Sequence, residues 1–161
     1  MILVSACLLG KKTKYDGGSN PHELLKLYDD CGCFLPFCPE ALGKLSIPRP
    51  PAEIFAGTGQ AVWQKNAIVK DKNENDVTEY FLAGATAAQE LAEAHQVKYA
   101  ILKENSPSCG VHSIYDGTFS HKKIKGQGVA AAALAEAGIT IYSERDLSPD
   151  LIERLIREDE K

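Results

Sequence analysis

Short apolar runs alternate with helical patterns along the chain, and this alternation constrains the fold more than any other feature of the sequence. The predicted strands are residues 2–6, 34–37, 67–70, 99–102 and 139–142. The predicted helices are residues 21–30, 78–95, 128–137 and 149–157. Strands that are joined through helices form βαβ units, whose right-handed crossovers place helices on both faces of a parallel sheet. The sequence therefore predicts a three-layer Rossmann-like α/β domain with a small, mainly parallel sheet.

Local signals support several of these helix boundaries. Asn20 and Ser148 are residue types that cap helix N-termini, and each precedes a proline that suits a first helical turn. Gly138 is typical of a helix C-terminus. The two remaining long segments, 39–60 and 103–125, show no clear element and are expected to be ordered loops. Loops of that length in a compact domain usually carry function.

Composition excludes several classes of protein. The chain has 161 residues, which suits a single domain over 1–161, and its 44% hydrophobic and 25% charged residues are typical of a globular protein. The net charge is −4 and no basic cluster is visible, which argues against binding to a nucleic-acid polymer. No apolar run approaches the ~18–20 residues of a membrane span, and no secretory leader is recognisable, so we expect a cytoplasmic protein. The sequence does not indicate an oligomeric state.

Three cysteines stand at the ends of predicted strands. Cys7 and Cys38 directly follow the first two strands, and Cys109 lies in the loop after strand 99–102. Loops that leave the carboxyl ends of parallel strands emerge at the same edge of the sheet, so we expect the three thiols to meet there. One such cysteine could be a small buried hydrophobic residue. Three of them, each close to a glycine or proline, favour a ligand set for a thiophilic metal.

The number of ligands separates two kinds of metal site. Thiolates suit zinc or an iron–sulfur cluster, and a structural zinc site needs a fourth ligand, commonly from a pair with two to four intervening residues. Cys31 and Cys33 have only one residue between them and lie at a helix–strand junction, at the opposite edge of the sheet, so a structural role is expected. An odd count of five cysteines and an expected reducing compartment argue against a disulfide framework. Three ligands leave one iron of a cluster open, which favours a catalytic cluster.

Further candidates lie next to these thiols. Glu40 stands two residues after Cys38, and the intervening proline fixes the local backbone. A carboxylate there could act as a general acid or base, or could be an ordinary solvated loop residue. Ser106 and Ser108 precede Cys109 and could bind substrate, relay a proton or simply form a turn.

Two basic residues are also candidates. Arg49 lies in a rigid proline-rich segment and could pair with Glu53 or with an anionic ligand; a structural ion pair is the favoured interpretation. Lys103 ends a predicted strand at the edge where the thiols are expected, so it could face a substrate.

Six separated motifs then resemble one bacterial family, long catalogued as a domain of unknown function, that includes the thiouracil desulfidases. The motifs are SACLLG at 5–10, YDGG at 15–18, CPE at 38–40, PRPPAE at 48–53, KENSPSCG at 103–110 and YDGTF at 115–119. The resemblance extends over residues 2 to about 145. This sequence departs from the family pattern at Thr13 and Lys14, where cysteine and arginine are frequent, and at Lys44, where glycine is usual. These changes could alter which substrate fits.

The resemblance implies a cofactor and a reaction. Family members bind a [4Fe–4S] cluster through three cysteines, which match Cys7, Cys38 and Cys109. The open iron takes the sulfur of a small thiolated substrate, and thiouracil plus water gives uracil plus hydrogen sulfide without a net redox change. An acidic residue and a serine assist, and these roles correspond to Glu40 and to Ser106 or Ser108. An open cluster of this kind is exposed to oxidation, so an aerobic preparation could lose it.

Two other functions are compatible with the same residues. The first alternative is a sulfur carrier or redox-sensing module that binds a cluster through the three thiols but converts no substrate. The second is a structural zinc protein in which Cys31 or Cys33 completes a set of four ligands.

Overall fold

A four-stranded parallel sheet forms the centre of the protein. The computed structural model describes all residues 1–161, and the strand order is β2–β1–β5–β8. These strands are β1 (Ile2–Ser5), β2 (Phe34–Phe37), β5 (Tyr99–Leu102) and β8 (Thr140–Ser143), and each neighbouring pair is parallel. The predicted parallel sheet is confirmed, with strand ends within two residues of those expected.

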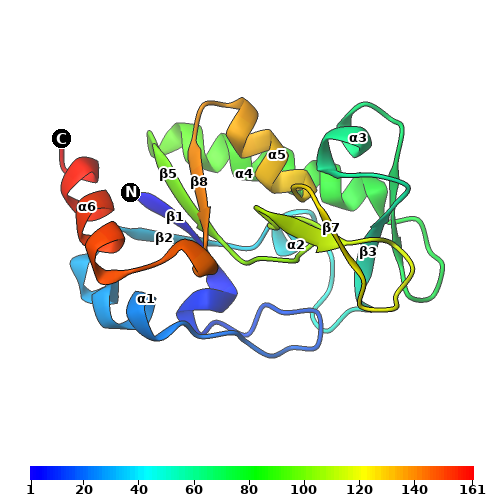
Figure 1. Ribbon diagram of the computed structural model, residues 1–161, viewed down its shortest axis with the longest axis horizontal. Coiled ribbons are helices and arrows are strands. Elements are labelled where there is room, and N and C mark those ends of the chain that lie inside the picture. The colour runs from blue at the N-terminus through cyan, green and yellow to red at the C-terminus, as the bar shows by residue number, and fades with distance from the viewer.

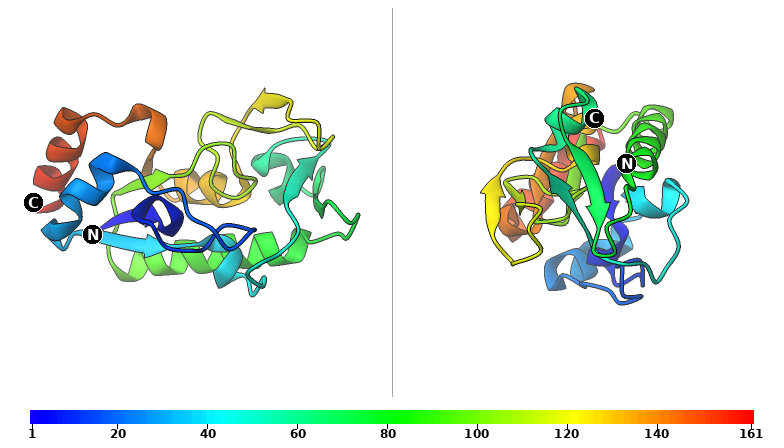
Figure 2. Two further views of the ribbon diagram at one scale, coloured as in Figure 1. Left: turned by 90° about the horizontal axis from the view of Figure 1, so that it is seen from below. Right: turned by 90° about the vertical axis from the view of Figure 1, so that its right-hand side faces the viewer.

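Helices cover both faces of this sheet (Figures 1 and 2). Successive side chains of a strand point to opposite faces. On β1, Leu3 packs in one buried cluster with residues of α4 (Thr78–Ala94) and α5 (Val129–Glu136). Ile2 and Val4 pack in another with residues of α1 (Glu23–Tyr28) and α6 (Pro149–Asp159). The predicted three-layer α/β class is therefore confirmed.

Helix boundaries follow the local signals in part. The Ser148 hydroxyl accepts a hydrogen bond from the Leu151 amide at the start of α6, as expected of an N-cap. Asn20 does not cap α1, which begins three residues later after His22 and is followed by a short 3-10 helix, η2 (Asp29–Cys31). None of the helices combines the length and the apolar character that crossing a membrane requires.

The two segments predicted as long loops contain regular structure, so that prediction was wrong in detail. Segment 39–60 holds α2 (Pro39–Leu42), β3 (Ala52–Phe55) and the start of α3 (Gly59–Trp63). β3 pairs antiparallel with β4 (Ile68–Asp71), and the other segment contains an antiparallel pair of β6 (Ser113–Tyr115) and β7 (Lys123–Lys125). β4 coincides with the predicted strand 67–70, whereas β3, β6 and β7 mix polar with apolar residues and lack a continuous apolar run. They lie at the end of the molecule away from the two chain termini (Figure 1).

Close backbone contacts at glycines position the segments that follow the sheet. A Cβ atom on Gly84 of α4 would lie 2.0 Å from the carbonyl oxygen of Pro39, so only glycine lets α2 pack this closely on α4. A Cβ atom on Gly128 would lie 2.5 Å from the carbonyl carbon of Ser108. The amides at the start of α5 donate to the carbonyl oxygens of Pro107, Ser108 and Gly110. Both glycines therefore hold the segments after Cys38 and around Cys109 against rigid helices.

The remaining short elements lie around the sheet. A 3-10 helix, η1 (Ala6–Leu9), directly follows β1, and another, η3 (Glu144–Asp146), directly follows β8. The N-terminal ammonium group of Met1 forms an ion pair with Asp159 of α6 at 3.0 Å, so the two ends of the chain lie together.

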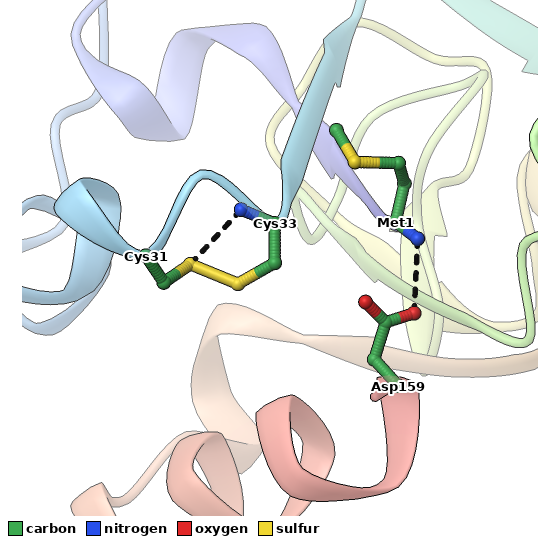
Figure 3. Close-up of a disulfide and its surroundings, with 4 residues drawn as sticks. All are labelled: Met1, Cys31, Cys33 and Asp159. Carbon is green, nitrogen blue, oxygen red and sulfur yellow. Dashed lines mark hydrogen bonds and ion pairs between the residues drawn. A yellow bond between two sulfur atoms is a disulfide. The ribbon is translucent and has the colours of Figure 1, made fainter. Parts of the chain in front are cut away.

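Cys31 and Cys33 form a disulfide (Figure 3). The expectation against disulfides was wrong for this pair, because the turn between η2 and β2 brings the two sulfurs together across a single glycine, Gly32, with a φ of 68°. Their predicted location is confirmed: they precede β2, whereas Cys38 follows it. The two ends of β2 therefore carry different chemistry: a disulfide before the strand and a free thiol after it.

Candidate active site

Three free cysteines line one cavity at the carboxyl edge of the sheet. Cys7 lies in η1, Cys38 is the N-cap residue of α2, and Cys109 lies in the loop after β5. All three line a cavity of about 470 Å³. Three segments that are distant in sequence therefore bring their thiols to a common space, as the strand topology predicted.

The protein environment makes these thiols poor nucleophiles. Burial raises the pKa of Cys7, Cys38 and Cys109 above the ordinary value of a thiol, and the nearby charge of Glu40 raises the pKa of each of them further. Protonated thiols neither attack a substrate nor bind a metal, whereas a bound metal deprotonates the thiols that coordinate it. The free thiols are therefore not activated as nucleophiles, and a metal that binds them has to displace their protons.

The available donors limit which metal groups could bind. No three side chains of His, Cys, Asp or Glu lie close enough together to hold one metal ion. Cys31 and Cys33 are bonded to each other and so offer no thiolate as the fourth ligand of a zinc site. Three thiols spread over one cavity suit a group of several iron atoms, which is larger than an ion and is bound by thiolates.

The loop that carries Cys109 is held by a buried carboxylate that sequence reasoning did not single out. Glu104 is 2% exposed, and its Oε1 accepts hydrogen bonds from the amides of Val111, His112 and Ser113 at 2.8, 2.8 and 3.0 Å. Burial alone would raise the pKa of Glu104, but these amide donors outweigh it and the pKa is lowered. Its position at the end of β5, within the KENSPSCG motif, is the signal that could have identified it.

Glu40 and the two serines form a connected hydrogen-bond chain. The Ser108 hydroxyl donates to Oε1 of Glu40, and the Oγ atoms of Ser106 and Ser108 are 3.0 Å apart. A hydroxyl has one proton, so Ser106 must donate to Ser108 while its own oxygen accepts from the amides of Ser108 and Cys109, both at 3.1 Å. Ser106 lines the cavity, whereas Ser108 is fully buried behind it.

Arg49 holds the other oxygen of Glu40. Its Nη2 lies 2.7 Å from Glu40 Oε2 and 3.0 Å from the carbonyl oxygen of Thr13, and its side chain is 6% exposed. The favoured ion pair is present, but Glu53 as its partner was wrong. Glu53 instead accepts hydrogen bonds from the amides of Gly117 and Phe119. The Arg49 amide donates to the carbonyl oxygen of Tyr15, which turns this segment toward the first loop and toward Glu40.

Lys103 and the positions that depart from the family pattern also have defined places. Lys103 lines the cavity, but its ammonium group is paired with Glu144 at 3.1 Å. Thr13 and Lys14 line the cavity, while Lys44 does not. Two of the three departures therefore contact the space where a substrate would bind.

The comparisons with known proteins agree with this geometry. Residues 2–146 match the family described as 2-thiouracil desulfurase. The chain belongs to the 2-thiouracil desulfurase family. It is 45% identical over 148 residues to the uncharacterized protein YbbK of Bacillus subtilis (strain 168), which covers 92% of this chain and 98% of that protein.

A solved structure supports the same assignment for this member of the desulfurase family. The structure of the [4Fe-4S]-dependent thiouracil desulfidase TudS superposes with a TM-score of 0.82 at 40% identity, over 96% of each chain. The predicted family, the α/β fold class and the class of sulfur-removing enzyme are confirmed. The roles of the individual site residues stay predictions.

Proposed function

We propose that this protein hydrolyses the C=S bond of a small thiolated pyrimidine such as thiouracil, giving the oxo compound and hydrogen sulfide. The observation that carries the proposal is the common cavity of Cys7, Cys38 and Cys109, with the carboxylate of Glu40 and the hydroxyl of Ser106 beside them. TudS, the structural neighbour, is named a [4Fe-4S]-dependent thiouracil desulfidase. Residues 1–161 would act as one catalytic domain.

The three cysteines would hold a [4Fe–4S] cluster. When bound, it supplies an iron without a protein ligand, which acts as a Lewis acid and sulfur acceptor. The raised pKa values of the thiols mean that loading releases protons and is favoured by higher pH. The free thiols of Cys7, Cys38 and Cys109 support a cytoplasmic location, where an exposed disulfide such as Cys31–Cys33 exchanges with dissolved thiols.

The cavity suits a small planar substrate. A volume of about 470 Å³ falls within the ~300–1,000 Å³ of small-molecule sites. Tyr15, Tyr115 and Phe119 line it together with His121, so aromatic faces are available to a pyrimidine ring. A free small molecule, rather than a nucleic-acid polymer, is therefore the proposed substrate.

Glu40 would be the general base. Arg49 and Ser108 each bind one of its carboxylate oxygens, which fixes the carboxylate while each oxygen keeps a lone pair for a water molecule. Glu40 takes a proton from the water that attacks the thiocarbonyl carbon. As the C–S bond breaks, the two protons of that water pass to the departing sulfur, and the carbon keeps the oxygen.

The two serines would have different tasks. Ser106 faces the cavity and can donate a proton to the substrate or to the departing sulfur. Ser108 is buried between Ser106 and Glu40. Once Glu40 has taken a proton from water, both hydroxyls would reverse: Glu40 donates to Ser108 and Ser108 donates to Ser106, which frees the Ser106 proton for the departing sulfur. Removal of Ser106 should therefore affect the substrate directly, and removal of Ser108 should act through Glu40.

Substitution of Glu40 by glutamine tests the proposal. Glu40→Gln and wild-type protein are reconstituted anaerobically, and iron, sulfide and the release of hydrogen sulfide from 2- and 4-thiouracil are measured. We expect equal cluster content and a rate lower by about 10²–10⁴-fold, because a general base is lost. Glu23→Gln, an exposed carboxylate of α1, is the matched control and should keep the full rate.

Two results would contradict this function. Full activity of Glu40→Gln would remove the carboxylate from the reaction. A wild-type protein with a complete cluster that releases no sulfide from either thiouracil would instead be the sulfur carrier or redox-sensing module.

A further inference from the structure

The disulfide at the amino edge of the sheet is open to solvent. Cys31 is exposed and Cys33 is half-buried. No atom lies within 4 Å of the place where a Cβ of the intervening Gly32 would stand, so nothing covers the turn. A dissolved nucleophile can therefore approach this S–S bond, in contrast to the buried thiol of Cys109.

The short spacing between the two cysteines means that this disulfide contributes little to the stability of the fold. Only one residue separates the two cysteines, and a cross-link stabilises a fold chiefly by closing a long loop of the unfolded chain. The backbone of Cys33 is already held by the sheet, since its carbonyl oxygen accepts the Ile2 amide at 2.7 Å. Exposed disulfides of this kind belong to the labile, exchanging class.

The turn makes the two sulfurs unequal. The amide of Cys33 donates a hydrogen bond to Sγ of Cys31 at 3.2 Å (Figure 3). The same amide would stabilise a thiolate on Cys31 after the bond breaks, and thiol–disulfide exchange favours the departure of the more stable thiolate. The sulfur of Cys33 is therefore the electrophile and Cys31 is the leaving group.

We propose that the Cys31–Cys33 disulfide is a second sulfur site, which accepts hydrosulfide and stores it as a persulfide on Cys33. Hydrosulfide attacks the sulfur of Cys33, a new S–S bond forms, the Cys31–Cys33 bond breaks, and Cys31 leaves as a thiolate. The sulfur of hydrosulfide is oxidised and one cysteine sulfur is reduced, so no further oxidant is needed. Attack by a second thiol on the outer sulfur of the persulfide would pass that sulfur on, with Cys33 leaving as a thiolate. The site is then a dithiol, and a disulfide-level oxidant such as oxidised glutathione has to close the Cys31–Cys33 bond before it can accept sulfide again.

Hydrosulfide is the nucleophile that fits the site best. It is the smallest sulfur nucleophile, and Cys33 is only half-exposed, packed against the cluster of α1, α6 and β1 side chains. Its presence near this protein rests on the proposed function, because desulfidation of a thiocarbonyl compound yields hydrogen sulfide. The chain would then produce sulfide at one edge of the sheet and capture it at the other.

Direct addition of sulfide tests this site without any thiouracil. Cluster-loaded protein in the disulfide form is treated anaerobically with sodium sulfide and alkylated, and its peptides are analysed by mass spectrometry. We expect one extra sulfur atom on Cys33 and one newly alkylated thiol on Cys31, in equal amounts. The double variant Cys31→Ser/Cys33→Ser should gain no sulfur while keeping the absorption of its cluster.

Three outcomes would overturn the proposal. They are an unchanged disulfide peptide, equal sulfur gain by the double variant, and extra sulfur on Cys31 in place of Cys33. Because the sulfide is supplied from outside, a failure here is distinguishable from a failure of desulfidation, which the thiouracil assay measures separately.

Discussion

The five cysteines of this protein divide between the two edges of its sheet and differ in chemistry. At the carboxyl edge, Cys7, Cys38 and Cys109 come from three distant segments and are free thiols around one cavity. At the amino edge, Cys31 and Cys33 are neighbours in sequence and share an exposed disulfide.

This difference shows that the chemistry of a cysteine depends on which other cysteines the fold brings close to it and on how deeply they are buried. The turn at Gly32 joins Cys31 to Cys33, and the disulfide is exposed at Cys31 and half-buried at Cys33. The parallel strand topology brings the other three together, and burial raises the pKa of each of these thiols. The proposed metal-binding role at one edge and the proposed exchange role at the other thus use the same residue type.

The largest effect is expected at the carboxyl edge, where we propose that the cluster binds. Cys109→Ala removes one of the three proposed ligands, so the reconstituted variant should lack the iron–sulfur absorption and release no sulfide from thiouracil. Iron analysis, visible absorption and the sulfide assay measure this directly. Cys33→Ser, at the other edge, is the matched control and should keep both properties. A Cys109→Ala variant with its cluster and activity intact would remove the proposed distinction between the edges.

The next effect concerns the residue that fixes the proposed base. Arg49→Met leaves the Glu40 carboxylate without its charged partner at 2.7 Å. We expect kcat to fall by up to about 100-fold, because a misplaced catalytic group costs rate more than affinity. KM and the iron content should change little, and Arg49→Lys should recover part of kcat. A fall in iron content that matches the loss of rate would instead assign Arg49 to cluster assembly.

The part of the fold that the sequence predicts well is the part with long-range regularity. β1, β2, β5 and β8 coincide with mainly apolar runs, and the apolar stripe on α4 recurs over several helical turns. The convergence of the three thiols follows from strand direction alone. The antiparallel pairs β3–β4 and β6–β7 were not predicted, because their pairing depends on contacts with α4 and α5 that no local pattern encodes.

The sequence predicts which residues lie near the thiols but not the hydrogen bonds and ion pairs that join them. The CPE and SPSCG motifs place Glu40, Ser106 and Ser108 near the thiols, yet the order Ser106 to Ser108 to Glu40 depends on the tertiary fold. The partner of Arg49 was misjudged because Glu53 is close in sequence, whereas the backbone turn brings Arg49 to Glu40. Glu104 was not predicted, because its residue type alone does not show that the carboxylate is buried and binds amides; only its position in the KENSPSCG motif indicates a role.

A smaller effect is expected from the residue that supports the carboxyl edge. Glu104→Gln weakens three charge-assisted hydrogen bonds to amides at 111–113, which should lower the free energy of unfolding at neutral pH by about 1–3 kcal/mol. The pKa of Glu104 is lowered in the folded state, so its contribution is complete above the unfolded value of about 4.3 and is lost as the pH falls below it.

Urea unfolding between neutral and acidic pH measures this dependence. The difference between wild type and Glu104→Gln should shrink as the pH decreases through that range. A difference that is independent of pH would show that the carboxylate charge contributes nothing to the loop.

The smallest effect is expected at the amino edge, and it provides the sharpest contrast with Cys109. The double variant Cys31→Ser/Cys33→Ser should retain the cluster and the full rate with thiouracil, because both residues lie at the sheet edge opposite the cavity. Its free energy of unfolding should fall by only about 1–2 kcal/mol, since the cross-link closes a loop with a single intervening residue. Urea unfolding of the cluster-free proteins, compared with wild type reduced by a strong phosphine, separates the loss of the bond from the serine substitutions. A large loss of stability in both the double variant and the reduced wild type would show that the disulfide is a structural element of the fold. A loss of activity without a loss of stability would show that the disulfide affects the active site at the other edge of the sheet.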